Sequence, residues 1–523
     1  MRRAGEIRLP FDHDERAFRE ALSSLGIEPG DRWVILRKSL DARRKGRIQW
    51  VYAIGIEEAG DPAAPEPPVR RVPPEPRPVV VGSGPAGLFA AYRLALAGVG
   101  SVLLEQGPPL GERMRAIARF VRHGALDPRA NLCFGAGGAG TFSDGKLGTR
   151  VRSPHRRFVL ETLVGLGAPE AIRYLASPHL GSNGIRRVIA RLITRLESMG
   201  VEIRFGAAVA GVSARGGRCT GVVLEDGSIV PASHVILAVG HSARPLLAAL
   251  ARAGVTVERK GFAVGARLVH SASLVERIQY GDAAGHPALP PATYRLATTW
   301  RTGAGERALY SFCMCPRGLV LNAATEPDGV VSNGMSNRPP RSKWSNAAFV
   351  VPVREDDIAS DDPLEAVAWQ RAIEAAAARA ANPRGGCHAL PAQTLPAFLD
   401  GREDRELPFS GTLVPVRPAR LDRLLPPFVV EAMRTGFDRL GRSVPRLVGR
   451  EGVLVGVETR TSSPVRIVRD RETFESVSLP GLYPVGEGAG YAGGIASAAI
   501  DGIAAADALL ATLQPRSHEI SPD

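Results

Sequence analysis

The feature that most constrains the fold is the glycine motif Gly82-x-Gly84-x-x-Gly87. It follows a short apolar run, Val79–Val81, which is typical of a buried parallel strand, and it precedes a helical stretch, Leu88–Ala97. The three glycines permit a tight turn, a close approach of the backbone to a pyrophosphate, and close packing of the helix on the strand. The segment therefore predicts a strand–helix–strand unit whose helix N-terminus binds phosphate groups.

An acidic residue ends the second strand of this unit. The apolar run Val102–Leu104 leads directly into Glu105. A carboxylate at this place accepts hydrogen bonds from the hydroxyls of a ribose, and its charge repels a 2′-phosphate. We therefore expect Glu105 to bind the ribose of an adenine dinucleotide.

A second glycine-rich segment near the C-terminus separates NAD from FAD. A strand at 482–485 runs into a glycine turn that carries Glu487, and Gly493-Gly494-Ile495 opens a helix of small residues. In a protein of this kind the acid binds the ribityl chain of a flavin, and the helix N-terminus stabilises negative charge on the reduced ring. Only one dinucleotide motif is found. We therefore predict bound FAD. The electron partner is either NAD(P)H, as a transient donor, or oxygen.

Several further motifs resemble a known family. They are Asn131–Leu147 (NLCFGAGGAGTFSDGKL), Ser311–Pro316 (SFCMCP), Ser332–Ser336 (SNGMS), Glu458–Arg466 (ETRTSSPVR) and Gly486–Ile495 (GEGAGYAGGI). Together with residues 82–105 they resemble the bacterial, largely uncharacterised FAD-dependent dehydrogenases of the glutathione-reductase-like flavoprotein superfamily. The resemblance implies bound FAD and a substrate lobe inserted between the flavin-binding halves. The chain departs from it at Arg317-Gly318, where two glycines are expected.

The expected fold is an α/β, FAD-binding Rossmann-like domain with an inserted α+β substrate lobe and a small N-terminal α+β domain. We expect the N-terminal domain at residues 1–60, a Pro-rich linker at 61–78, the FAD-binding domain at 79–245 and 446–515, the substrate lobe at 246–445, and a tail at 516–523.

The expected cofactor-binding residues come from the two glycine segments, the middle strands and the loop that the resemblance places near the flavin. They are Gly82, Gly84, Pro85, Ala86, Gly87, Glu105, Gln106, Arg113, Gly138, Thr141, Ser143, Asp144, Val209, Gly240, Gly486, Glu487, Gly493, Gly494 and Ile495.

Five residues are candidates for chemistry. Lys146 could stabilise anionic reduced flavin or belong to a self-contained loop. Arg460 and Arg466 could clamp a substrate carboxylate or phosphate, or form an internal ion-pair network. His241 could donate a proton or be an ordinary loop histidine, and Tyr491 could be a donor or a packing lid. The sequence predicts no metal site.

The spacing of Cys313 and Cys315 differs from the CxxC and CxxxxC spacing of flavin disulfide reductases. We therefore expect these residues to be buried structural thiols.

The amino-acid composition bears on three classes of protein: disulfide-rich, membrane-spanning and nucleic-acid-binding. The five cysteines, which lie far apart except for Cys313 and Cys315, favour a reduced, cytoplasmic protein, and no apolar stretch is long enough for a membrane span. The net charge is +13, but only five of the 66 basic residues are lysine, which indicates coding bias. The densest basic run, Arg37–Arg47, is either the solvated face of a hairpin or a contact with RNA or another partner.

We therefore predict an FAD-dependent oxidoreductase. It would transfer a hydride between flavin and a small or medium organic substrate, with or without an acid group. The alternatives are a flavoprotein that binds or modifies RNA through its N-terminal domain, and a non-catalytic dinucleotide-binding protein.

Overall fold

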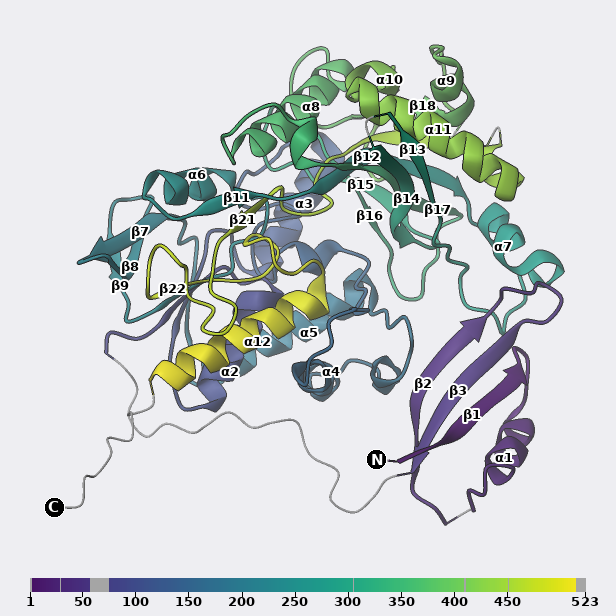
Figure 1. The fold of residues 1–523 in the computed structure, drawn as a ribbon, viewed down its shortest axis with the longest axis horizontal. Helices are drawn as coiled ribbons and strands as arrows, with labels where there is room; N and C mark the ends of the chain where they lie inside the picture. Colours follow the sequence, from purple (N-terminus) through teal and green to yellow (C-terminus); the bar gives the residue numbers. More distant parts are fainter. Residues whose placement is uncertain are drawn as a thin grey trace.

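The computed structural model describes residues 2–28, 30–56, 75–303, 305–408, 411–449 and 451–513 (Figure 1). Most of the predicted linker at 61–78 and the whole predicted tail at 516–523 lie outside these ranges. The described chain forms a small N-terminal unit and a larger body built on two main sheets.

The N-terminal unit is a three-stranded antiparallel sheet with one helix. Its sheet has the order β1-β3-β2, and the elements are β1 (Arg2–Pro10), α1 (Glu15–Ser23), β2 (Trp33–Asp41) and β3 (Gln49–Ile56). Asp14 caps α1 by accepting a hydrogen bond from the Ala17 N–H at 2.8 Å. The free edge of β2 is attached to the larger body, because Lys38 N–H donates to the Tyr174 carbonyl at 2.8 Å and Lys38 O accepts from Ala176 at 2.9 Å.

The first main sheet is parallel and five-stranded. Its order is β22-β10-β4-β5-β6, formed by β4 (Val79–Val81), β5 (Val102–Glu105), β6 (Glu202–Phe205), β10 (Val235–Leu237) and β22 (Leu482–Pro484). One face of this sheet packs on α2 (Pro85–Leu96), α5 (Gly181–Ser198) and α12 (Ile495–Thr512), and the other on the sheet β7 (Val209–Arg215), β8 (Arg218–Leu224) and β9 (Ile229–Pro231). Strands from both ends of the chain are therefore neighbours, and the predicted Rossmann-like architecture is confirmed.

Helices α2 and α12 approach each other unusually closely. A Cβ placed on Gly502 would lie 2.1 Å from the Ala86 carbonyl oxygen, so this crossing requires glycine. The close contact packs the first turn of α2 against the middle of α12.

The second main sheet has seven strands in the order β13-β14-β17-β12-β20-β18-β19. They are β12 (Phe262–Ser271), β13 (Ala297–Thr302), β14 (Gly305–Cys315), β17 (Trp344–Val353), β18 (Leu390–Thr394), β19 (Val416–Pro418) and β20 (Val453–Glu458). Around it lie α7 (Ala272–Tyr280), α8 (Glu365–Ala381), α9 (Leu395–Asp400), α10 (Leu421–Leu424), α11 (Pro427–Ser443) and the ribbon β15 (Leu319–Asn322) and β16 (Ser332–Met335).

The predicted boundary at residue 446 is too early. Strand β20 pairs with β12 and β18, so residues 453–458 belong to the seven-stranded sheet. The chain returns to the parallel sheet through the short ribbon of β11 (Val257–Arg259) and β21 (Val465–Ile467). The remaining helices are α3 (Leu110–His123), α4 (His155–Gly165) and α6 (Arg244–Arg252).

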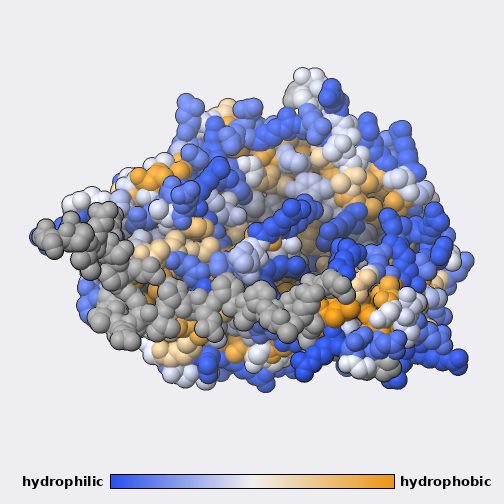
Figure 2. All heavy atoms as spheres, turned by 60° about the horizontal axis from the view of Figure 1, so that its bottom comes forward, coloured by the Kyte–Doolittle hydropathy of each residue, from blue (hydrophilic) through white to orange (hydrophobic). Residues whose placement is uncertain are grey.

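One helix in the described part of the chain, α12, is long and apolar enough to cross a membrane, but 67% of it is buried inside the protein. Its two acidic residues are paired internally, Asp501 with Arg469 at 2.6 Å and Asp507 with Arg93 at 2.6 Å. Burial against α2 therefore accounts for its composition. On the face that Figure 2 shows, hydrophilic residues prevail and apolar residues form scattered patches.

Candidate functional site

A cavity of about 1140 Å³ is lined by both main sheets. Its lining starts at the ends of β4 and β5, passes the loop 138–143, and reaches β14 and β20 of the seven-stranded sheet. Sixteen of the predicted residues line it: Gly82, Gly84, Pro85, Ala86, Glu105, Gln106, Gly138, Ser143, Val209, Gly240, His241, Arg460, Gly486, Glu487, Gly494 and Ile495. The structure thus brings residues from distant parts of the sequence into one cavity.

The glycine motif has the geometry of a phosphate site. Gly82 has a φ of +100°, and a Cβ there would lie 2.4 Å from the Ala238 carbonyl oxygen. Gly87 does not line the cavity. A Cβ there would lie 1.9 Å from the Gly82 carbonyl oxygen, so the tight turn requires glycine at this position. At Gly84, which caps α2, a Cβ would meet no atom within 4 Å. The space over Gly84 is therefore open to a pyrophosphate at the helix N-terminus.

Besides its predicted contact with a ribose, Glu105 accepts hydrogen bonds from within the protein. Its Oε2 accepts hydrogen bonds from Ser83 N and Oγ at 3.0 and 2.7 Å. Its Oε1 accepts from Gly107 N at 2.9 Å and Gly135 N at 3.0 Å. Both carboxylate oxygens thus tie the glycine motif to the loop at 135–138, and a ribose hydroxyl would share the acceptor with these donors.

Three predicted cofactor residues support the cavity from behind. Arg113 is fully buried and donates to the carbonyls of Asn131, Gly135, Ala136 and Gly138 at 2.7–3.1 Å. Thr141 is also fully buried. Asp144 is buried and turned away from the cavity, because it pairs with Lys146 at 2.7 Å and His179 at 2.7 Å. These three residues do not line the cavity, and their contact with the cofactor stays a prediction. The carbonyl-rich glycine loop needs an internal donor, and Arg113 supplies it.

The pKa of Asp144 reflects this ion-pair cluster. Burial alone would raise the pKa, but the hydrogen bond from His179 and the charge of Lys146 outweigh burial and lower it to about 2. The carboxylate is therefore ionised at neutral pH and holds the loop that follows the glycine run.

Glu487 also lines the cavity, directly after Gly486, where a Cβ would lie 3.0 Å from the Cβ of Ala86. Burial raises the pKa of its carboxyl to about 7, and the charge of Lys260 offsets only part of this effect. Among the residues that the structure describes, none donates a hydrogen bond to this carboxyl. Ile495 begins α12 beside it, after Gly494 with a φ of +92°. Gly493 does not line the cavity.

These features fit FAD. The open space at Gly84 suits the pyrophosphate, and the unpartnered Glu487 suits hydroxyls of the ribityl chain. The N-terminus of α12 suits the electron-rich edge of the flavin ring, since a helix N-terminus stabilises negative charge.

Arg460, one of the two arginines proposed as a substrate clamp, donates its hydrogen bonds to residues of the protein itself. Arg460 donates to both oxygens of Glu374, from Nε at 3.0 Å and from Nη2 at 2.7 Å. Its Nη1 donates to Ser242 Oγ at 3.1 Å and Thr325 Oγ1 at 2.8 Å. Arg244 binds the same carboxylate at 2.8 Å to each oxygen. The internal ion-pair network, one of the two readings of the sequence, is what the structure shows.

His241 lines the cavity beside this network. Burial, together with the charges of Arg460 and Arg244, lowers the pKa of its imidazole to about 3. The ring is therefore neutral at neutral pH, so His241 cannot serve as an imidazolium acid there.

Lys146 does not line the cavity. Its Nζ pairs with Asp144 and donates to the carbonyl of Met314 in β14. Although burial opposes it, the neighbouring thiols and Asp144 raise the pKa of Lys146. The lysine is thus a fixed cation behind the tip of β14.

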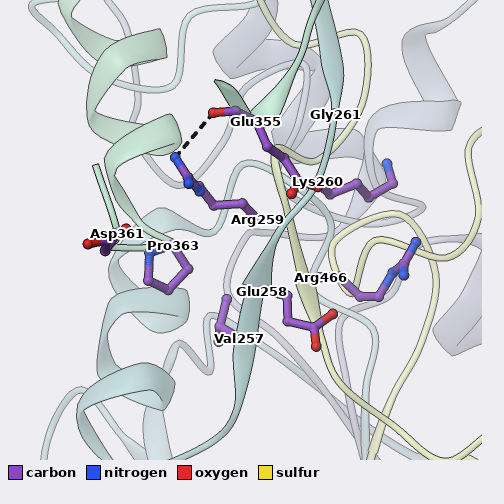
Figure 3. Close-up of a pocket in the computed structure, with 9 residues that line it drawn as sticks. All are labelled: Val257, Glu258, Arg259, Lys260, Gly261, Glu355, Asp361, Pro363 and Arg466. Carbon is purple, nitrogen blue, oxygen red and sulfur yellow. Dashed lines mark hydrogen bonds between the residues drawn. The ribbon is translucent and has the colours of Figure 1, made fainter. Parts of the chain in front are cut away.

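Arg466 lines a second cavity, of about 510 Å³ (Figure 3). Figure 3 shows Lys260 and Arg466 extending to one side of β11, whereas Arg259 extends to the other, where it donates to the Glu355 carbonyl at 3.3 Å. The Tyr491 ring packs between the guanidinium groups of Arg466 and Arg469, 5.3 and 3.8 Å from its centroid. Its hydroxyl accepts from Arg469 N at 3.1 Å. These contacts fit the packing role, and the role of proton donor stays a prediction.

The sequence analysis missed two buried charged residues, Arg267 in the seven-stranded sheet and Glu374 in α8. Arg267 is fully buried and pairs with Glu458 at 2.6 Å, and Glu374 is nearly as buried. A signal was present, because Arg267 interrupts the apolar run Phe262–Val269, and an arginine in a buried strand requires an acidic partner.

Two basic side chains of the run Arg37–Arg47 in the N-terminal unit make contacts within the protein. Arg43 pairs with Asp41 at 2.6 Å, and the Lys38 ammonium lies over the rings of Trp50 and Tyr52 at 4.5 and 5.0 Å. RNA binding by this run stays a prediction.

Four family models match the chain. Residues 261–461 match a model described as FAD-dependent protein, C-terminal domain-like, and residues 175–288 match pyridine nucleotide-disulphide oxidoreductase. Residues 80–138 match an NAD(P)-binding Rossmann-like domain, and residues 1–57 match a domain of unknown function.

Similar proteins include one full-length relative. An uncharacterised protein of Clostridium beijerinckii is 34% identical over 535 residues, which covers 97% of this chain and 98% of that protein. A hydroxyneurosporene desaturase of Cereibacter sphaeroides is 42% identical over 53 residues, 10% of this chain and 11% of the desaturase.

The solved structures are more distant. A variant of 2-methyl-3-hydroxypyridine-5-carboxylic acid oxygenase has a TM-score of 0.34 with 14% identity, over 84% of this chain and 83% of the oxygenase. CtdE in complex with FAD has a TM-score of 0.33 with 11% identity, over 83% of each chain. The chain belongs to the family of FAD-dependent oxidoreductases that its C-terminal-domain model and the Clostridium beijerinckii protein represent.

Proposed function

We propose that the protein transfers a hydride between FAD and a small or medium organic substrate. The observation that carries the proposal is the lining of the larger cavity. Glu487 and Ile495, which fit the flavin end of FAD, share this cavity with Cys313 and Glu458 from the seven-stranded sheet. A substrate held against that sheet would therefore lie next to the flavin, and the flavin supplies the redox chemistry.

The residues of the chain would contribute in three ways. Gly84 and the N-terminus of α2 would hold the pyrophosphate, and Glu487 would fix the ribityl chain. The Arg244–Glu374–Arg460 network would keep one wall of the cavity rigid and electrically balanced against the neighbouring Glu326. The neutral His241 would present a ring nitrogen to substrate without adding charge.

The electron partner and the compartment belong to the same proposal. We propose NAD(P)H as a transient hydride donor, because the sequence carries one dinucleotide motif and FAD would occupy it. The cysteine usage supports a cytoplasmic site of action.

The test is anaerobic mixing of the FAD-loaded protein with NADH, NADPH and a panel of oxidisable organic acids and alcohols. A hydride mechanism predicts loss of the long-wavelength flavin absorption band by at least one donor, and a slower loss when the transferred hydrogen is deuterium. Hydride transfer is contradicted if no donor reduces the flavin. It is also contradicted if a donor reduces the flavin at the same rate with hydrogen and with deuterium.

A further inference from the structure

Strand β14 contains an irregularity at its end. Phe312 pairs with Ala348 and Cys315 with Asn346, so β14 has one more residue than β17 between these pairs. Cys313 occupies this bulge with a φ of +44°. A residue with a side chain seldom adopts that conformation, and a bulge turns a side chain in a new direction. Here the bulge directs Cys313 to the cavity, whose wall it helps to form.

A second thiol lies directly behind the first. Cys315 is fully buried, and its Sγ lies 3.5 Å from the Cys313 carbonyl oxygen. Residues two apart in an extended strand have Cα atoms roughly 6.6 Å apart, which is within the range of disulfides, and a bulge shortens this distance. All five cysteines are free thiols in the structure.

Two cations surround the pair. Arg267 Nη1 donates to the Cys313 carbonyl at 3.2 Å, and the Lys146 ammonium binds the carbonyl of Met314, between the two cysteines. Asp144 and Glu458 are the ion-pair partners of these cations. The hydrogen bond from Cys315, followed by the charges of Lys146 and Arg267, lowers the pKa of the Cys313 thiol despite its burial. The hydrogen bond and burial raise the pKa of Cys315.

We propose that Cys313 and Cys315 form a redox-active thiol pair that exchanges two electrons with the flavin bound in the cavity. Cys313 is the sulfur that faces the cavity, and Cys315 is the resolving thiol behind it. The proposal rests on the proposed function only in that a reducible flavin occupies this cavity. It differs from the expectation of two structural thiols, since the CxC spacing alone gave no sign of the bulge.

The exchange balances in atoms and electrons. When the pair is oxidised, a disulfide joins the two sulfurs. Two electrons from the reduced, anionic flavin break the S–S bond, and the flavin's proton passes to the pair. Cys315 leaves as the thiol, Cys313 leaves as a thiolate beside Lys146 and Arg267, and the flavin returns to its oxidised form. The reverse step oxidises the pair.

The chain provides a matched control. Cys133 also lines the cavity, but its Sγ donates to the Ala323 carbonyl at 3.9 Å, and no other cysteine in the described residues neighbours it in the sequence. A Cys133→Ser variant therefore removes a cavity thiol without touching the proposed pair.

The experiment is an anaerobic titration of the oxidised, FAD-loaded protein with dithionite, combined with thiol alkylation and mass spectrometry. The wild-type chain and Cys133→Ser should take up four electrons per flavin, and Cys313→Ser and Cys315→Ser should take up two. Alkylation after mild oxidation should leave Cys313 and Cys315 both unlabelled in the wild-type chain, and reduction should make both available.

Uptake of two electrons by the wild-type protein, with both thiols labelled after oxidation, would overturn the pair. Alkylation of the wild-type chain needs no variant, so a variant that fails to fold leaves the test intact. A flavin that bleaches with two electrons and no thiol change contradicts this inference but not hydride transfer. A protein that takes up four electrons from dithionite and shows the thiol change, but whose flavin no hydride donor reduces, contradicts hydride transfer but not the pair.

Discussion

Arg460 and Glu374 form a two-pronged ion pair at the wall of the larger cavity, with Nη2–Oε2 at 2.7 Å and Nε–Oε1 at 3.0 Å. The two side chains are only 5% and 1% exposed. Removing one partner from such a pair leaves a buried charge without compensation and costs about 3–5 kcal/mol. We therefore predict that Glu374→Gln lowers the free energy of unfolding by about this amount, because two arginines lose their common partner.

Urea denaturation of Glu374→Gln and of a surface control, Glu365→Gln, checks this prediction. The control should change the unfolding free energy by less than about 0.5 kcal/mol. Arg460→Ala is expected to be destabilised as well, and its FAD content should fall in step with its folded fraction. A stable Arg460→Ala that keeps its FAD and loses only substrate turnover would return Arg460 to the role of a substrate clamp.

The same pair predicts a loss of stability in acid. Burial opposes ionisation of Glu374, but Arg460 and Arg244 lower the pKa of its carboxyl to about 2, below an unfolded value of about 4.3. The stabilisation is therefore complete above about pH 4.3 and is lost as the pH falls toward about 2. Unfolding free energies measured across this window should fall with pH in the wild-type protein and fall less steeply in Glu374→Gln. Parallel curves would contradict the assignment.

Glu487 predicts a pH effect of the opposite sign in the FAD-free protein. Burial raises the pKa of its carboxyl to about 7, so the folded state binds this proton more tightly than the unfolded state. The resulting stability is present below about pH 4.3 and is lost as the pH rises to about 7. Glu487→Gln should flatten this part of the stability profile, whereas the exposed Glu472→Gln should not. An unchanged profile in Glu487→Gln would show that the carboxyl is already solvated.

Gly84 and Gly87 should respond differently to substitution. A side chain at Gly84 meets open space, so Gly84→Arg is expected to fold. It would fill the pyrophosphate position, and the loss of charge-assisted hydrogen bonds of about 1.5–3 kcal/mol each should weaken FAD binding at least roughly tenfold. In Gly87→Ala the new Cβ would lie 1.9 Å from the Gly82 carbonyl oxygen, which distorts the turn itself.

Circular dichroism and FAD titration of the purified apoproteins separate the two effects. Gly84→Arg should keep a wild-type spectrum and melting temperature while it loses FAD affinity. Gly87→Ala should lose stability as well as affinity. Wild-type FAD affinity in Gly84→Arg would place the pyrophosphate elsewhere.

The sequence was sufficient where the signal is local. The strand at Val79–Val81, the turn at Gly82 and the helix at Pro85–Leu96 depend on neighbouring residues, and all three lie where the motif predicts them. The C-terminal turn at Gly486 and helix at Ile495 are equally local. Their convergence on the first motif could be predicted because parallel strands place their carboxyl ends at one edge of a sheet.

The rest depends on contacts between residues far apart in the chain. Arg460 looked like a substrate clamp because its partner, Glu374, lies in a helix with no motif. The internal role of Arg113 was missed because nothing local shows that four carbonyls surround it. Cys313 looked structural because the bulge that exposes it arises from the register between β14 and β17. Such features follow from strand pairing and helix packing, which spacing in one sequence does not record.

The most direct test of the account is a crystal structure of the protein with bound FAD. The account predicts the pyrophosphate over Gly84 at the N-terminus of α2, and the flavin ring between Ile495 and Cys313, facing the seven-stranded sheet. A flavin ring found outside this cavity, or one separated from the seven-stranded sheet by other parts of the chain, would contradict the central claim that one cavity joins the cofactor to its substrate.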